Sequence, residues 1–277
     1  IVDIAGLVKG ASKGEGLGNQ FLANIRECDA IIHVLRCFDD SGIVHVDGSV
    51  DPVRDKEIID MELQLKDLET LENRAKRVEK AARVGGDKAA KIEMDVIDTY
   101  RKVLLEGKSA RTVSFETEDE QAAAKSLFLL TAKPVLYVCN VDDKSASTGN
   151  EHTARVAEAI KDEEAEMLII SAQTEADIAE LETYEEKQMF LEDMGLSESG
   201  CNRLIKAIYH LLTLQTFITA GEMEVKAWTF RRGWKAPQCA GVIHTDFEKG
   251  FIRAEVISYD DYMTHKTEAA CRAPGCL

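Results

Sequence analysis

The 277-residue sequence lacks the patterns of several protein classes. Its seven cysteines form no C-x-x-C pair, which argues against a zinc site or a disulfide framework and for reduced thiols. It has no apolar stretch as long as a membrane span and no signal-peptide pattern at its start. Its net charge of −16 argues against non-specific coating of nucleic acid, because phosphates are bound by concentrated lysine and arginine. We therefore expect a cytoplasmic protein with no membrane partner and no DNA partner.

The sequence also lacks a phosphate-binding G-x-x-x-x-G-K-[ST] loop. Gly107-Lys108-Ser109 has the correct last three residues, but Lys102 stands where the first glycine is required. The glycine-rich run from Gly14 to Gly18 fails the dinucleotide-binding pattern, because its third glycine comes one residue early. Neither run therefore serves as a nucleotide-phosphate motif.

An acid followed by a glycine loop is present at the start of the chain. Asp3 and Gly6 form a D-x-x-G step that opens into a glycine- and lysine-rich run ending at Gly18. In phosphate-hydrolysing switch proteins this carboxylate holds the water shell of Mg²⁺, and the glycine lets a backbone N–H approach the γ-phosphate. A strand followed by a flexible loop is the alternative. Leu7, which follows the step, has no group that could orient an attacking water.

Buried strands are predicted at three places in the chain. Continuous apolar runs, typical of strands covered on both faces of a parallel sheet, span residues 30–38, 134–139 and 166–170. Helical segments separate them, which indicates an α/β fold with a doubly wound parallel sheet. Ligands of such sheets bind beyond the carboxyl ends of the strands, where we expect Asp3, Asn140 and Ser171.

A charged stretch over about residues 55–107 interrupts the sheet. Its apolar residues recur at broadly helical spacing, and Gly85-Gly86-Asp87 breaks the pattern. This predicts an antiparallel helical hairpin that projects from the domain. The hairpin could be a solvated structural arm or a partner-binding lever.

The pattern of apolar and polar residues changes at about Leu214. Residues 225–230 and 250–257 alternate between apolar and polar, which predicts strands of a small β-rich module without a closing strand. Residues 226–253 carry six cations and two acids, a local charge of +4. Trp228 and Trp234 flank Arg231-Arg232, a mixture suited to stacking on RNA, with Trp234 the better exposed candidate. A solvated basic face without a partner stays equally open.

Two short motifs follow the later strands. Asn140, Val141 and Asp143 stand where guanine-specific switch proteins have N-K-x-D, so that valine replaces the lysine whose stem lies along the base. Ser171-Ala172 follows the next strand and matches the companion base-contact loop. Together with D-x-x-G, in this order, these motifs favour a nucleotide site.

The run from Asp3 to Asn19, D-I-A-G-L-V-K-G-A-S-K-G-E-G-L-G-N, closely resembles the YchF family, the Obg-like ATPases of the translation-factor class of P-loop proteins. The resemblance covers essentially the whole chain and includes Arg36-Cys37-Phe38, Gly85-Gly86-Asp87-Lys88, Leu214-Gln215-Thr216-Phe217, Ala236-Pro237-Gln238 and the run from His244 to Ile252. It implies a P-loop domain with an inserted helical arm and a C-terminal TGS domain of ubiquitin-like β-grasp type. It also implies preference for ATP over GTP through N-x-x-E. Asp143 replaces that Glu and keeps a GTP-specific switch protein open.

The resemblance implies how the chain is divided. Residues 1–54 and 111–213 would form the two parts of the nucleotide-hydrolase domain, 55–110 the coiled-coil arm and 214–277 an incomplete TGS domain. Mg²⁺ and ATP, or GTP, would be the cofactors, and the partner would be the ribosome or a ribosomal subunit, together with translation factors. Because the P-loop is missing, we expect a fragment or partial gene product, truncated at both ends, that hydrolyses nucleotide only as the full-length protein.

The resemblance also implies roles for single residues. His45 would position the attacking water beside Gly6 and Leu7, and Asp3 would hold Mg²⁺ through water; a surface histidine is the alternative reading of His45. The expected base-binding residues are Asn140, Val141, Asp143, Ser171 and Ala172. The expected partner-binding residues are Arg231, Arg232, Trp234, Lys235 and His244, although His244 could instead fix a turn. The competing function is a ribosome- or protein-binding adaptor without catalysis.

Overall fold

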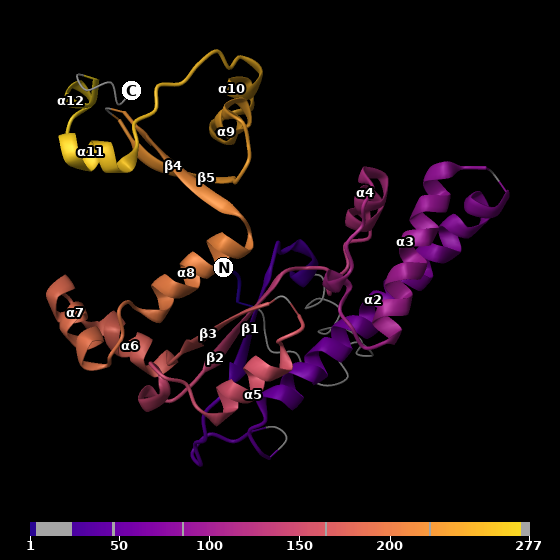
Figure 1. Cartoon of the computed structure of the whole chain (residues 1–277), viewed down its shortest axis with the longest axis horizontal. Helices are drawn as coiled ribbons and strands as arrows, with labels where there is room; N and C mark the ends of the chain where they lie inside the picture. The colour runs from indigo at the N-terminus through magenta and orange to yellow at the C-terminus, as the bar shows by residue number, and fades with distance from the viewer. Residues whose placement is uncertain (4–23, 46–47, 85, 164, 222, 273–277) are drawn as a thin grey trace. The chain divides into compact units, whose positions relative to one another are not determined.

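The computed structural model describes residues 1–3, 24–45, 48–84, 86–163, 165–221 and 223–272 (Figure 1). The chain divides into two compact units, Ile1–Leu212 and Thr213–Leu277. Among the described residues, no helix combines the length and the apolar character needed to cross a bilayer.

The first unit is built on a parallel sheet. Its strands are β1 (Ile31–Arg36), β2 (Val135–Asn140) and β3 (Glu166–Ile170), in the order β1-β2-β3. The three apolar runs therefore form strands as predicted. Continuous apolar sequence suits them because both faces of a parallel sheet are covered by other elements.

Helices connect and cover these strands. In chain order they are α2 (Pro52–Val84), α3 (Lys88–Leu105), α4 (Glu118–Ser126), α5 (Glu151–Ala159), α6 (Ala172–Glu180), α7 (Tyr184–Asp193) and α8 (Gly200–Leu211), with the 3₁₀ turns η2 (Ala110–Thr112) and η3 (Asp143–Ser145). Residues 24–27 are also helical. Reciprocal capping boxes at Thr117, Asn150 and Thr183 satisfy the free N–H groups that begin α4, α5 and α7.

The two faces of the sheet pack against different helices. On one face Leu35, Tyr137 and Cys139 pack with Val156 and Ile160, so that α5 covers it. On the other face Leu136 and Val138 pack with α8 through Ala207 and its apolar neighbours. The layering of helix, sheet and helix agrees with the predicted doubly wound arrangement.

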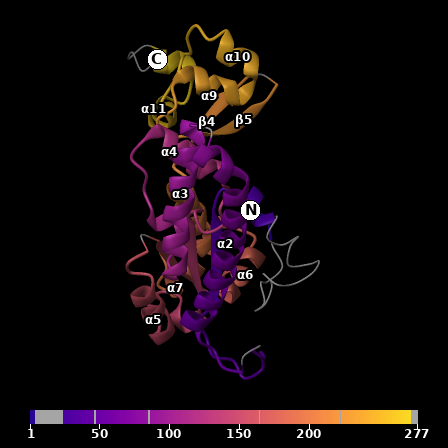
Figure 2. The same cartoon turned by 90° about the vertical axis from the view of Figure 1, so that its right-hand side faces the viewer.

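Helices α2 and α3 form the predicted arm and lie side by side in both views (Figures 1 and 2). Gly86 adopts a left-handed conformation (φ 61°) in the turn, which glycine permits without steric cost. Asp87 then caps α3 by accepting hydrogen bonds from Ala89 N and Ala90 N. An apolar seam that includes Leu71, Val96, Ile97, Tyr100 and Leu104 joins the arm to the segment after it.

The second unit contains an antiparallel pair, β4 (Leu214–Ala220) and β5 (Val225–Arg231), with Phe217 opposite Trp228. Four short helices follow: α9 (Ala236–Ile243), α10 (Thr245–Lys249), α11 (Tyr259–His265) and α12 (Glu268–Arg272). The predicted strand over 225–230 is confirmed.

Two strand predictions are wrong. Residues 250–257 form no strand, and Ile252 and Val256 are 92% and 72% exposed. Alternation supplies an apolar face, but a strand also needs a neighbour to accept its backbone hydrogen bonds, and this segment has none among the described residues. Residues 1–3 likewise lie outside any strand, so Asp3 does not end one.

Candidate functional site

The carboxyl ends of β2 and β3 meet at one edge of the sheet. Asn140 is the last residue of β2 and pairs with Ile170, the last of β3. The Asn140 Oδ1 accepts a hydrogen bond of 3.0 Å from Ala172 N, the first residue of α6. The two loops that carry the predicted base-contact motifs are therefore joined directly.

A second set of contacts joins the same loops through Asp143. Its Oδ1 accepts hydrogen bonds from Ser171 Oγ at 2.6 Å and from Thr174 Oγ1 at 2.8 Å. These hydrogen bonds hold the pKa of Asp143 below its usual range, because they stabilise the charged carboxylate. The stabilised carboxylate is an anion that acts as a hydrogen-bond acceptor only.

Thr174 is absent from the residues that sequence reasoning assigned to the site. Ser171 caps α6 by accepting from Thr174 N, and both side chains are 2% exposed. The S-x-x-T spacing at a helix start is the signal that predicts this cap. The two hydroxyls donate to Asp143 in the loop after β2. This acid lies 28 residues before Ser171, so the sequence around Ser171 does not identify it.

Val141 differs from its predicted role. Its side chain is 3% exposed and packs in the sheet core with Cys37, Cys139 and Val156. Its N–H donates to Ile170 O at 2.9 Å. The valine side chain therefore belongs to the sheet core.

The end of β1 is tied to the same edge. Cys37 N donates to Asn140 O at 2.7 Å, and Asn150 Nδ2 donates to Cys37 O at 2.7 Å. Beyond Cys37 the Arg36 guanidinium holds the loop by donating to the carbonyls of Phe38, Asp40 and Ile43. This loop leads directly to His45.

His45 is docked on the first turn of α2. Its Nε2 lies 2.9 Å from Asp55 Oδ2, and the two side chains are 17% and 25% exposed. A carboxylate only accepts, so the Nε2–H of His45 is the donor of this contact. Arg54 donates to the other carboxylate oxygen of Asp55. Sequence reasoning missed Asp55, which lies ten residues away with no motif between them.

The other residues predicted to lie beside Mg²⁺ and the γ-phosphate are Asp3, Gly6 and Leu7. Asp3 is exposed, and Gly6 and Leu7 lie outside the described residues. The described part of the chain contains no group of three His, Cys, Asp or Glu side chains arranged to hold a metal ion. Mg²⁺ in phosphate-transfer sites is bound by one or two carboxylates together with phosphates and waters, so a single carboxylate such as Asp3 fits that mode of binding.

In the second unit the predicted partner-binding residues follow β5. Gly233 (φ 88°) permits a tight turn in which Trp234 N donates to Arg231 O at 3.2 Å. Trp234 is 40% exposed, as expected. His244 caps α10 by accepting at Nδ1 from Asp246 N, a contact that fits the turn-forming alternative.

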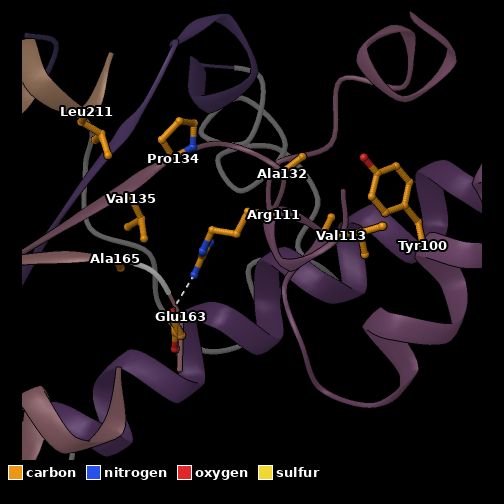
Figure 3. Close-up of a pocket in the computed structure, with 10 residues that line it drawn as sticks. Tyr100, Arg111, Val113, Ala132, Pro134, Val135, Glu163, Ala165 and Leu211 are labelled. Atoms are coloured by element: carbon orange, nitrogen blue, oxygen red, sulfur yellow. Dashed lines mark hydrogen bonds and ion pairs between the residues drawn. The ribbon is translucent and has the colours of Figure 1, made fainter. Parts of the chain in front are cut away.

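At the amino end of β2 a cavity of about 310 Å³ lies beside Pro134 and Val135 (Figure 3). Arg111 and Glu163 face each other across it, with Nη2 to Oε2 at 2.9 Å. This is the opposite end of the strand from Asn140. The cavity therefore does not belong to the predicted nucleotide site.

Glu163 is the centre of a partly buried ionic network beside this cavity. Its carboxylate accepts from Lys56 of α2, from Arg111 of η2 and from Tyr137 OH of β2. Burial alone would raise the pKa of Glu163, but the hydrogen bonds from Lys56 and Arg111 outweigh it and lower that pKa. The pKa of Lys56 is raised in turn by Asp60 and Glu163, which outweigh its own burial. The network joins the base of the arm to the sheet.

Two family models match parts of the chain. Residues 1–82 match a model described as a 50S ribosome-binding GTPase. Residues 214–277 match the model of the YchF GTPase C-terminal region, which is described as a protein of unknown function (DUF933).

Curated proteins and a solved structure match nearly the whole chain. The ribosome-binding ATPase YchF of Bacillus subtilis is 52% identical over 275 residues, which cover 99% of this chain and 74% of that protein. The protein of the same name from Escherichia coli O157:H7 is 50% identical, with the same coverage. Obg-like ATPase 1 of Gallus gallus is 44% identical over 99% of this chain and 70% of its own length. The structure of the Schizosaccharomyces pombe YchF GTPase superposes with a TM-score of 0.83 at 39% identity, covering 99% of this chain and 74% of that one.

Proposed function

The chain belongs to the YchF/Obg-like ATPase family. On that premise we propose that it is part of a ribosome-associated ATPase that couples nucleotide hydrolysis to ribosome binding. The observation that carries the proposal is the direct joining of the two base-contact loops at the carboxyl edge of the sheet. Asn140 binds Ala172, and Asp143 binds Ser171 and Thr174. This is the edge at which parallel α/β sheets bind their ligands.

Preference for ATP over GTP is supported by the hydrogen bonds of Asp143. Both hydroxyl donors, Ser171 and Thr174, fall on Oδ1. Guanine presents two N–H donors to a carboxylate, one for each oxygen, whereas adenine presents only its exocyclic amine. An oxygen that already accepts two hydrogen bonds has little capacity for a third. The remaining oxygen of the exposed Asp143 suits a single donor.

The phosphate side is proposed from the D-x-x-G step and from the docked histidine. Asp3 would hold Mg²⁺ through water, and when bound the ion would neutralise charge that develops on the transferred phosphoryl group. Gly6 would present its N–H to the γ-phosphate, while Leu7 would leave the positioning of water to another group. His45, whose ring Asp55 holds in place through Nε2, would position the attacking water.

The domain division follows the same premise. We assign residues 1–54 and 111–213 to the nucleotide-hydrolase domain, 55–110 to the coiled-coil arm and 214–277 to a TGS domain. The β4–β5 hairpin followed by α9 is the order in which a β-grasp fold begins, and α9 packs against β5. The exposed Arg231, Arg232, Trp234 and Lys235 would contact the partner from this module. Such a protein works in the cytoplasm.

Calorimetric titration of ATP and GTP with Mg²⁺ tests the proposal. The titrations use the chain itself and a version extended upstream with a G-x-x-x-x-G-K-[ST] loop. We expect tight binding by the extended version, with ATP tighter than GTP. Tighter GTP would establish a GTP-specific switch instead, and binding by neither version would leave the adaptor function.

Ribosome association is tested separately by cosedimentation with purified ribosomes. We expect the chain to pellet with ribosomes. A double Arg231→Glu/Arg232→Glu variant tests the C-terminal patch, and undiminished pelleting would remove these two arginines from the contact.

A further inference from the structure

The end of the helical arm is the most basic surface segment of an acidic chain. We define the arm tip as residues 74–91, which include the end of α2, the turn and the start of α3. It carries seven cations and two acids, a local charge of +5, although the whole chain has a net charge of −16. The charge is therefore concentrated where the arm ends.

Both acids of the arm tip are already engaged. Glu79 pairs with Arg83 at 2.8 Å, and Asp87 caps the first turn of α3. Arg74 pairs with Glu93, just beyond the tip. The other five cations are exposed and form no ion pair among the described residues: Lys76, Arg77, Lys80, Lys88 and Lys91. Their charge is uncompensated and available to an anionic partner.

Helical spacing gathers part of this charge on one face. Lys76, Lys80 and Arg83 stand at i, i+4 and i+7 on α2, so they form a single stripe along the helix. The seam toward α3 is made by other positions of α2, Leu71, Ala75 and Val78. The stripe consequently points to solvent and not into the hairpin.

The described side chains of the arm tip offer no apolar anchor. Among the described side chains, none of the exposed large apolar residues lies between residues 66 and 104. A protein interface needs buried aromatic or aliphatic anchors at its centre, and an interfacial membrane helix needs an apolar face. A phosphate backbone needs only positioned cations. The tip therefore has the chemistry of a polyanion-binding surface.

We propose that the arm tip binds the phosphate backbone of RNA through Lys76, Lys80 and their basic neighbours. The identity of this RNA rests on the proposed function: because we propose that the protein binds the ribosome, the RNA that the arm tip contacts is ribosomal RNA. The arm is a primary contact of the ribosome in addition to the C-terminal patch. Binding is shape- and charge-dependent and not sequence-specific, because lysines on a helix surface contact phosphates and not base edges.

The test compares two charge-reversal variants of the full chain. Lys76→Glu/Lys80→Glu changes the stripe, and Lys102→Glu/Lys125→Glu is the matched control. Lys102 and Lys125 are also exposed helical lysines that form no ion pair among the described residues. Circular dichroism first shows that both variants keep the helix content of the parent. Fluorescence anisotropy then measures binding to a short labelled RNA duplex over a salt series, and cosedimentation measures binding to ribosomes.

We expect the stripe variant to bind the duplex about tenfold more weakly and its salt dependence to fall by about two phosphate contacts, while the control keeps the parent's affinity. Equal weakening of both variants would show a net-charge effect only and would overturn the proposal. So would ribosome binding that is lost in the stripe variant while RNA affinity is retained, because the tip would then contact an acidic protein.

Failure of the proposed function gives a different result. If the parent binds the RNA duplex through the stripe but does not pellet with ribosomes, the RNA surface stands and the ribosome is not its source. If the parent binds neither, the arm-tip proposal is wrong.

Discussion

Nε2 of His45 and Oδ2 of Asp55 are 2.9 Å apart, and this contact joins the loop after β1 to the first turn of the arm helix α2. The loop itself is held by Arg36 at the end of β1. A change in the position of His45 would therefore alter a contact of the first turn of α2, at the base of the arm. The same helix reaches the arm tip, so one rigid element connects the proposed catalytic loop to the proposed RNA surface.

The first prediction concerns Asp55 as a positioning residue. In the version extended with a phosphate-binding loop, Asp55→Asn should lower kcat for ATP about tenfold with little change in KM, because the imidazole loses its orienting acceptor. Steady-state kinetics measure both constants. Asp51→Asn is the control, since Asp51 lies in the same turn but pairs with Arg155.

A double variant decides whether Asp55 acts through His45. In a His45→Ala background, Asp55→Asn should have no additional effect on kcat, because residues that act as a unit are not additive. An equal further loss of turnover in that background would show that Asp55 acts independently of the histidine.

The second prediction concerns base selection by Thr174. Thr174→Val removes one of the two hydroxyl donors from Asp143 Oδ1 while it keeps the size of the side chain. The affinity for GTP relative to ATP should rise about fivefold, the value of one hydrogen bond. Calorimetric titration with both nucleotides measures the ratio. Gln173→Ala, at an exposed position of the same helix, should leave the ratio unchanged. An unchanged ratio for Thr174→Val would show that the two hydrogen bonds to Asp143 Oδ1 do not limit the binding of GTP.

The third prediction is the pH dependence set by Glu163. Its folded-state pKa is lowered, so its stabilising contribution is present above the pKa of the unfolded chain and is lost as the pH falls through the folded value. Glu163→Gln should reduce the free energy of unfolding by about 2 kcal/mol at neutral pH, because Lys56 and Arg111 lose a partly buried anion. The difference from the parent should begin to shrink as the pH falls below the ordinary glutamate pKa of about 4.3, and it should disappear once the pH has passed through the lowered folded-state pKa of Glu163.

Circular dichroism in urea at several pH values measures this difference. It reports the long helices of the first unit, whereas both tryptophans, Trp228 and Trp234, lie in the second unit. A deficit that stays constant from pH 7 to about pH 3 would show that the charge of Glu163 is not its source.

The fourth prediction concerns Asp67, which is fully buried on α2. Its carboxylate accepts from Leu130 N at 2.8 Å, Thr131 N at 2.8 Å and Thr131 Oγ1 at 2.7 Å, and so fixes the segment before β2 on the arm helix. Asp67→Ala leaves these buried donors without a partner and should cost about 3 kcal/mol of unfolding free energy. Urea denaturation measures the loss. Glu72→Ala, at an exposed position of α2, should change stability by less than about 0.5 kcal/mol.

The secondary structure of the first unit was readable because its signals are local. The apolar runs of β1, β2 and β3 and the helical spacing that ends at Gly86 each depend on residues near one another in the chain. The prediction failed where the same local signal lacked a partner. Residues 250–257 alternate as a strand does, yet no neighbouring strand pairs with them in the described residues.

The site was predicted in part for the same reason. Asn140 and Ser171 follow from the rule that parallel strands end at a common edge. The rule does not say which way a side chain points, so Val141 was assigned to the base although it lies in the core. Thr174 and Asp55 were missed because each acts on a residue from another segment of the chain.

The sequence by itself determined the family, the parallel strands, the helical arm and the charge gathered at its end, because apolar periodicity, motifs and charge are properties of consecutive residues. Only the tertiary structure decided which groups meet. The hydroxyls of Ser171 and Thr174 converge on Asp143, His45 docks on Asp55, and Glu163 binds three elements at once. Such contacts join residues 10 to 107 positions apart, and burial in the folded core brings their donors to their acceptors.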